Sequence, residues 1–161
     1  METPFAAGER ELLLAYLQRQ RDLVVWKLNG LDHDRARGIA TGSGLTIHGI
    51  VRHLTDVERS WLRRWFDGQQ GLPVEGKTPG RVGGFDARPY DRLVDSLASY
   101  VEEADRCDEV VRSCNFDDLG VDVPGNLRWV LHHLIEETAR HLGHLDVLCE
   151  RADGRTGEQP S

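Results

Sequence analysis

The sequence predicts an all-α protein built as a four-helix bundle. Apolar residues recur at three- and four-residue spacings through four long segments, which glycine- or proline-containing stretches separate. No stretch alternates apolar and polar residues for long enough to indicate a β-strand. The four predicted helices span 8–29, 46–67, 90–114 and 126–151. Ligand and metal sites in such bundles are formed by inward-facing side chains of facing helices.

Length, net charge and the length of apolar runs exclude several classes of protein. The 161 residues suffice for one core, so we expect one bundle domain over 1–151 and a flexible tail over 152–161. A net charge of −7 argues against nucleic-acid binding, which needs clustered Lys and Arg. No apolar run approaches the ~20 residues that cross a bilayer, and Met1 to Pro4 opens no signal peptide. We therefore expect a cytoplasmic protein with no nucleic-acid or membrane partner.

The first predicted helix carries leucine and valine on one face and ends before Gly30. A loop over 31–44 follows, with a short helical turn at 32–37, and His33 is expected to be solvated there. The second predicted helix begins at Thr46, whose hydroxyl can cap it, and ends at Gly68. Its apolar face contains Ile50, Leu54, Val57, Trp61 and Trp65.

His53 lies on the apolar side of the second predicted helix, between Ile50 and Val57. A single histidine in such a position is usually an ordinary core residue. It becomes a candidate ligand when another helix supplies further metal donors. Asp56 and Glu58 follow it toward the flank of the helix. For Asp56 we expect exposed charge rather than a role in orienting His53.

The stretch 68–89 is rich in glycine and proline, so no long element fits it. A connection of this length either forms the lid or entrance of a binding site or is a connecting loop without a function of its own. Arg81 and Arg88 would be the residues to meet an anionic substrate. On the third helix a row of carboxylates indicates a solvated face, and Cys107 and Cys114 are expected to pack as small apolar residues.

The fourth predicted helix carries Glu137 and His141, four residues apart, so both lie on one face. His144 falls on the same stripe, and His133 lies one turn before Glu137. If His53 faces Glu137 and His141, two imidazoles and a carboxylate form a divalent-metal site. Zinc suits this donor set best, because catalytic zinc commonly has three protein ligands, and nickel, iron and manganese also fit. The alternative is that these Glu, Arg and His side chains form a solvent-exposed row on a surface helix and bind no metal.

Two segments resemble one known family. The segment 128–146 (RWVLHHLIEETARHLGHLD) and the segment 43–54 (SGLTIHGIVRHL), followed by VERSW at 57–61, resemble the DinB-like mycothiol transferase branch of the DinB/YfiT-like superfamily. Both motifs occur in the family's order and separation. The resemblance covers most of the chain, strongly in the second and fourth helices and loosely in the third.

The resemblance implies a four-helix bundle that holds a divalent metal with three ligands. Residue by residue, the family's ligands correspond to His53, Glu137 and His141. His144 falls just outside this triad and is expected to line the pocket or contact a ligand. His48 departs from the small or apolar residue of the family pattern and is not a candidate.

The resemblance also implies a metal-dependent S-transferase that uses a small thiol, in this branch mycothiol, against electrophiles in detoxification. Such a metal would bind the thiol in its open position and lower the thiol's pKa. Two alternatives stay open from the residues alone: a metal-dependent hydrolase, which needs the same open site, and a non-catalytic metal-stabilised stress or binding protein. A homodimer is compatible with the family, although no heptad seam in the sequence requires one.

Overall fold

All regular secondary structure is helical in the residues described by the computed structural model, which are 3–73, 85 and 92–157. Only isolated bridges occur outside the helices there, at Ala40 with Thr46 and at Leu119 with Asn126. The elements in order are α1 (Glu9–Leu28), α2 (His33–Arg37), α3 (Ile47–Glu58), η1 (Arg59–Phe66), α4 (Leu93–Ser113) and α5 (Leu127–Asp153).

Side-chain caps and glycines set the helix ends. The Thr46 hydroxyl accepts a hydrogen bond from the backbone N–H of Gly49, which confirms the predicted cap of α3. Asn126 caps α5 in the same way, by accepting from the N–H of Trp129 at 3.1 Å. Gly154 ends α5 with a φ of 81°, a left-handed conformation that glycine adopts without strain. The helix therefore runs two residues beyond the predicted end at Arg151.

The predicted second helix is a single rod with two backbone geometries. It is α-helical as far as Glu58 and then continues as the π-helix η1. At the end of η1 the N–H of Asp67 bonds to the carbonyl of Leu62, five residues earlier, at 3.0 Å. The wider turn changes which side chains face α5 in the second half of the rod.

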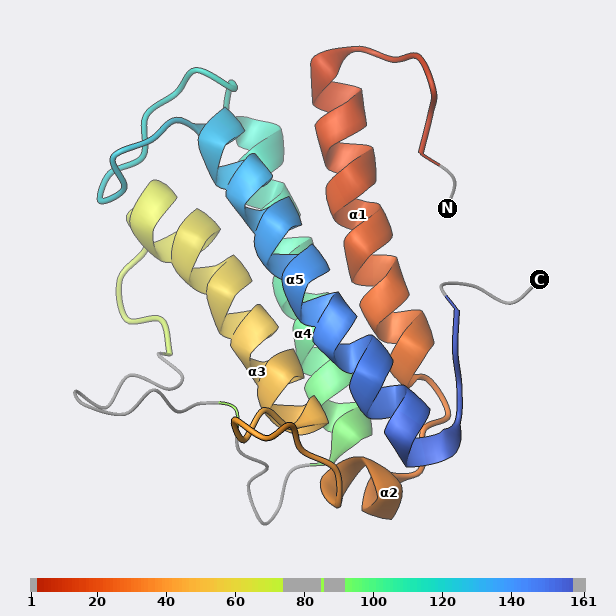
Figure 1. Ribbon diagram of the computed structural model, residues 1–161. Helices are drawn as coiled ribbons and strands as arrows, with labels where there is room; N and C mark the ends of the chain where they lie inside the picture. The colour runs from red at the N-terminus through yellow and green to blue at the C-terminus, as the bar shows by residue number, and fades with distance from the viewer. Residues whose placement is uncertain (1–2, 74–84, 86–91, 158–161) are drawn as a thin grey trace.

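The four long helical rods pack side by side (Figure 1). α5 lies between α1 and α3 and packs against both, and α4 packs against α3. α3 and α5 run in opposite directions. This arrangement confirms the predicted all-α four-helix bundle. No helix in the described part of the chain is both long and apolar enough to cross a membrane.

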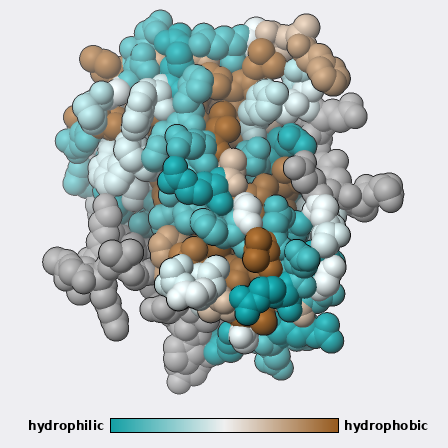
Figure 2. Space-filling model, viewed as in Figure 1, coloured by the Kyte–Doolittle hydropathy of each residue, from teal (hydrophilic) through white to brown (hydrophobic). Residues whose placement is uncertain are grey.

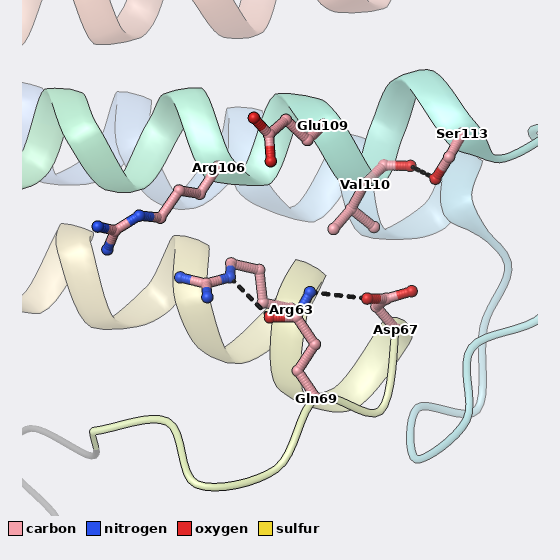
Figure 3. A pocket seen from close by; sticks show the side chains of 7 residues that line it. All are labelled: Arg63, Asp67, Gln69, Arg106, Glu109, Val110 and Ser113. Atoms are coloured by element: carbon pink, nitrogen blue, oxygen red, sulfur yellow. Dashed lines mark hydrogen bonds between the residues drawn. The ribbon is translucent and has the colours of Figure 1, made fainter.

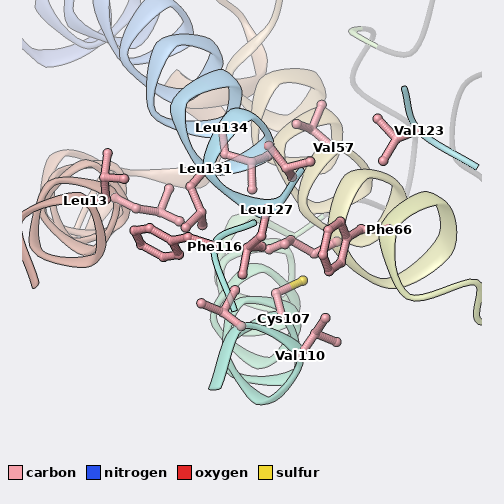
Figure 4. Packing of buried hydrophobic residues seen from close by; sticks show 14 residues of the cluster. Leu13, Val57, Phe66, Cys107, Val110, Phe116, Val123, Leu127, Leu131 and Leu134 are labelled. Atoms are coloured by element: carbon pink, nitrogen blue, oxygen red, sulfur yellow. The ribbon is translucent and has the colours of Figure 1, made fainter. Parts of the chain in front are cut away.

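Buried apolar side chains from all four rods form the core. Figure 4 shows one cluster in which Leu13 of α1, Phe66 of η1 and Cys107 of α4 surround leucines of α5. The cluster confirms that Cys107 packs as a small apolar residue. A second cluster fills the opposite end of the bundle, around Val24 and Ile50. The face seen in Figure 2 is largely hydrophilic, with smaller apolar patches between the polar side chains.

Several polar residues that were expected at the surface are buried. Asp56 and Glu58 are both buried, and Glu58 pairs with Arg21 of α1. On the acidic face of α4, Glu103 is buried against Arg59 and Arg63 of η1. These predictions of exposure were wrong because the rods on either side supply arginines that compensate the carboxylates.

Two further sequence predictions concern loops. His33 is half-buried as the first residue of α2, with its ring 5.3 Å from that of buried His48, so it is not the solvated loop residue expected. The positions 90 and 91, the expected start of the third helix, lie outside the described residues. So does most of the 68–89 stretch, including Arg81 and Arg88.

Candidate metal centre

His53, Glu137 and His141 meet in the seam between α3 and α5. His53 lies in the middle of α3, and the helical spacing of Glu137 and His141 presents both side chains to it. Glu137 Oε1 lies 3.2 Å from His53 Nε2 and 3.3 Å from His141 Nε2. The candidate ligand atoms of all three lie within 4.8 Å of one another. The structure thus brings together the three residues selected from the sequence.

The immediate surroundings hold these side chains in a partly dry environment. The His53 and His141 rings are 4.7 Å apart at an angle of 64°. The His141 side chain is 8% exposed and that of His53 28%, so the site opens to solvent on the His53 side. Arg140 Nη1 lies 3.4 Å from the second carboxylate oxygen of Glu137, which leaves Oε1 directed at the two imidazoles.

Burial and neighbouring charges set the protonation states. Burial, followed by the proximity of His53, lowers the pKa of His141 to about 4. Burial alone would raise the pKa of Glu137. The hydrogen bond with His53 and the electrostatic influence of His141, His53 and Arg140 outweigh the effect of burial, so the pKa of Glu137 is lowered. A neutral imidazole beside an ionised carboxylate is the combination that metal coordination requires.

Phe85 is a part of this site that sequence reasoning missed. Its ring lies 4.6 Å from the His53 ring and 5.4 Å from the His141 ring, stacked on the latter at 27°. Its carbonyl accepts a hydrogen bond from the backbone N–H of Thr46 at 3.0 Å. A Cβ atom at Gly49 would lie 1.8 Å from that carbonyl oxygen, so the chain passes over α3 only because residue 49 is glycine. The glycine at 49, one turn before His53, was the only hint in the sequence.

The other histidines on the stripe lie outside the triad. The His144 ring is 5.5 Å from that of His141, and its buried Nδ1 has no hydrogen-bond partner in the described part of the chain. His133 packs against Trp61 of η1, with 4.3 Å between ring centroids, rather than against Glu137. The structure therefore separates a three-donor cluster from its histidine neighbours.

A cavity of about 460 Å³ between η1 and α4 is a less suitable site. Figure 3 shows its lining, in which Arg63 is already hydrogen-bonded to Gln69, and Gln69 to Asp67. Arg63 also pairs with buried Glu103. Arg63 and Asp67 are thus already engaged, and no member of the triad lines this cavity.

The sequence matches the model of one protein family. The family model for mycothiol S-transferases matches residues 12–154, which is nearly the whole helical part of the chain. The chain belongs to the mycothiol S-transferase family. The match includes α3 and α5 in full, and with them all three residues of the triad. No curated protein matches the chain. Membership of the family supports a transferase that acts with mycothiol.

Proposed function

We propose that this member of the mycothiol S-transferase family is a metal-dependent S-transferase that uses mycothiol, and that His53, Glu137 and His141 are the ligands of its divalent metal. The observation that carries the proposal is the convergence of two imidazole nitrogens and one carboxylate oxygen from two helices within 4.8 Å. The donor set fits a catalytic zinc, which commonly has three protein ligands and one open position. Nickel, iron or manganese accept the same ligand types.

The chemistry that such a cation supplies is a lower pKa for a coordinated thiol, so that the thiolate predominates at neutral pH. The protein's own contribution is to keep the His141 imidazole neutral and Glu137 ionised, so that a carboxylate charge is present to offset the cation. Phe85 covers the imidazole rings on one side and excludes water there. The open His53 side is left for thiol and electrophile.

In the proposed reaction the thiol sulfur of mycothiol attacks an electrophilic carbon. A sulfur–carbon bond forms, the bond from carbon to the leaving group breaks with its electron pair, and the thiol proton passes to solvent. Holding both reactants at one site replaces a bimolecular encounter by an oriented one. The sulfur nucleophile is that of mycothiol, so the step needs none of the protein's cysteines, two of which, Cys107 and Cys149, are buried. A detoxifying role would follow from this chemistry.

A conjugation assay tests the proposal directly. Zinc-loaded protein should join mycothiol to an alkylating fluorophore such as monobromobimane faster than the uncatalysed reaction, and His53→Ala should lose at least about 100-fold in rate. Exposed His132 on α5 gives a matched control, and His132→Ala should retain the rate. Turnover of esters without thiol would indicate a hydrolase instead. Full metal binding with no turnover would indicate a non-catalytic binding protein, and either result would contradict the proposal.

A further inference from the structure

Four aromatic side chains line the seam between η1 and α5. The Trp61 ring lies 4.3 Å from that of His133, 4.9 Å from that of Trp65 and 5.4 Å from that of Trp129. The rings of Trp129 and His133 are nearly parallel, at an angle of 6° and a centroid distance of 5.4 Å. We call Trp61, Trp129 and His133 the aromatic wall.

The aromatic wall continues the seam that contains the metal triad. Trp61 follows His53 by eight residues along the α3–η1 rod, and His133 precedes His141 by eight residues on antiparallel α5. Both steps lead in the same direction along the seam. His133 is one helical turn, about 6 Å of axis, from Glu137, and Trp129 is one turn farther. The wall thus begins about one turn from the triad.

The aromatic wall is partly exposed to solvent rather than fully buried in the core. Trp129 is 49% exposed although it is the largest type of side chain. His133 is partly exposed, and its ring nitrogens make no hydrogen bond in the described part of the chain. Trp61 is placed by the π-helical turn of η1, and short π segments often occur at functional sites. A partly exposed aromatic surface that includes an imidazole is suited to a ring-shaped ligand.

We propose that the aromatic wall binds the amino-sugar ring of the thiol, and so determines which small thiol the enzyme accepts. This inference rests on the proposed function. In mycothiol the cysteinyl group is joined by an amide to a glucosamine. Five bonds separate sulfur from the sugar ring, which spans about 6 Å when extended. A sulfur atom held beside Glu137 therefore places the sugar one helical turn away along α5, at His133, against whose ring Trp61 packs.

The chemistry of the wall matches such a ring. A pyranose has one face of C–H groups, which packs on the electron-rich face of an indole, and a rim of hydroxyl groups. The nitrogens of His133 can donate to or accept from that rim. Trp129, one turn beyond His133, extends the aromatic surface toward the second ring of a glycosylated thiol.

Binding of the sugar portion alone gives a test that needs neither metal nor turnover. In ligand-observed NMR titrations, metal-free wild-type protein should bind glucosaminyl-inositol, the thiol-free part of mycothiol. Trp129→Ala and His133→Ala should each weaken this binding about tenfold. Trp26→Phe, at the tryptophan of α1, is the matched control and should bind as wild type does. Absence of binding to wild type, or equal binding by all variants, would overturn the inference.

Thiol selectivity gives the second measurement. For the zinc-loaded enzyme, the ratio of kcat/KM for mycothiol to that for N-acetylcysteine should fall about tenfold in both wall variants, mainly through KM for mycothiol. An equal loss with both thiols would mean a merely structural role and would overturn the inference. If wild type transfers neither thiol but binds the sugar through Trp129, the proposed function fails and the sugar site stands. If transfer occurs without preference between the thiols, only the sugar site fails.

Discussion

At the scale of single residues, the buried ion pair between Arg21 and Glu58 shows how charge is accommodated inside the bundle. Arg21 Nε and Nη2 each donate to a different oxygen of Glu58 at 2.7 Å, and Nη1 donates to Asp108 at 2.8 Å. The side chains of Arg21 and Glu58 are 4% and 1% exposed. Removing one partner of such a pair leaves a charge in a medium that solvates it poorly.

Glu58→Gln should therefore lower the free energy of unfolding by about 3 kcal/mol or more. The substitution keeps the shape of the side chain and removes only its charge. Glu102→Gln is the matched control, since Glu102 forms an exposed ion pair with Arg106 on α4 and should cost less than about 1 kcal/mol. Urea denaturation measures both. Similar losses in the two variants would show that the buried pair contributes no more than a surface pair.

The more deeply buried histidine of the triad, His141, should make the stability of the metal-free protein depend on pH. The pKa of His141 is lowered from 6.5 to about 4 in the folded state, chiefly by burial. Below pH 6.5 the unfolded chain therefore binds a proton that the folded chain does not. Stability should be fully present above pH 6.5 and should fall as the pH drops toward 4.

Urea denaturation of metal-free protein at a series of pH values between 7 and 4 measures this dependence. The matched variant is His141→Asn, which has no titrating ring and should show a shallower fall across the same range. An unchanged slope in the variant would contradict the assignment of a depressed pKa to His141.

The sequence was sufficient to select the residues of the triad but not their neighbours. Helical periodicity and the family resemblance together pointed to His53, Glu137 and His141. The structure brings these three side chains together. Periodicity tells which face a residue occupies, but not which side chain of another helix lies opposite. For that reason Glu58 was expected near the flank, while Arg21, which encloses it, is 37 residues away in the chain.

At the scale of the helices, Gly49 determines how the chain crosses α3. The backbone of Phe85 occupies the space that a side chain at residue 49 would need. Gly143 of α5 is also a helical glycine, but a Cβ atom there would meet nothing within 4 Å. Alanine at residue 49 would therefore meet a steric conflict, whereas alanine at residue 143 would show only its ordinary helix propensity. Comparing the two substitutions measures the effect of the conflict.

Gly143→Ala should stabilise the protein by about 0.5–1 kcal/mol, because alanine has the higher helix propensity. Gly49→Ala should forgo this gain, and it should displace Phe85 from the imidazole rings of the triad. Thermal unfolding measures the first effect, and the NMR shifts of the His53 and His141 ring protons measure the second. Equal stabilisation by the two substitutions, with unmoved ring protons, would show that Phe85 does not lie against Gly49.

Helix limits were largely predictable from local chemistry, whereas helix geometry was not. The Thr46 cap and the glycines that follow α1 and η1 mark the ends, and those ends were found. The π-helical turn over Arg59–Phe66 has no residue pattern of its own, so the sequence predicted a continuous α-helix there. The aromatic contacts of Trp61 depend on that turn and could not be derived from α-helical spacing.

At the scale of the whole molecule, the packing of the bundle protects two of the three cysteines. Burial, above all, raises the pKa of Cys107 well above its usual range and that of Cys149 to about 11. Cys114 is only partly buried. In the native protein an aromatic disulfide reagent should therefore modify one thiol per chain quickly, and all three after unfolding in denaturant.

Peptide mapping of the labelled protein checks this prediction. The label should be found at Cys114. Rapid labelling of Cys107 or Cys149 under native conditions would mean that the core opens far more often than its packing implies, and would reopen the question of a role for a protein thiol.

The central claim is that α3 and α5 together hold one divalent metal ion. Its most direct test is the zinc content of purified protein after dialysis, measured by elemental analysis for wild type, His53→Ala and the exposed control His132→Ala. We expect one zinc per chain in wild type and in His132→Ala, and almost none in His53→Ala, with all three proteins folded by circular dichroism. A folded His53→Ala protein that retains one zinc per chain would contradict this claim.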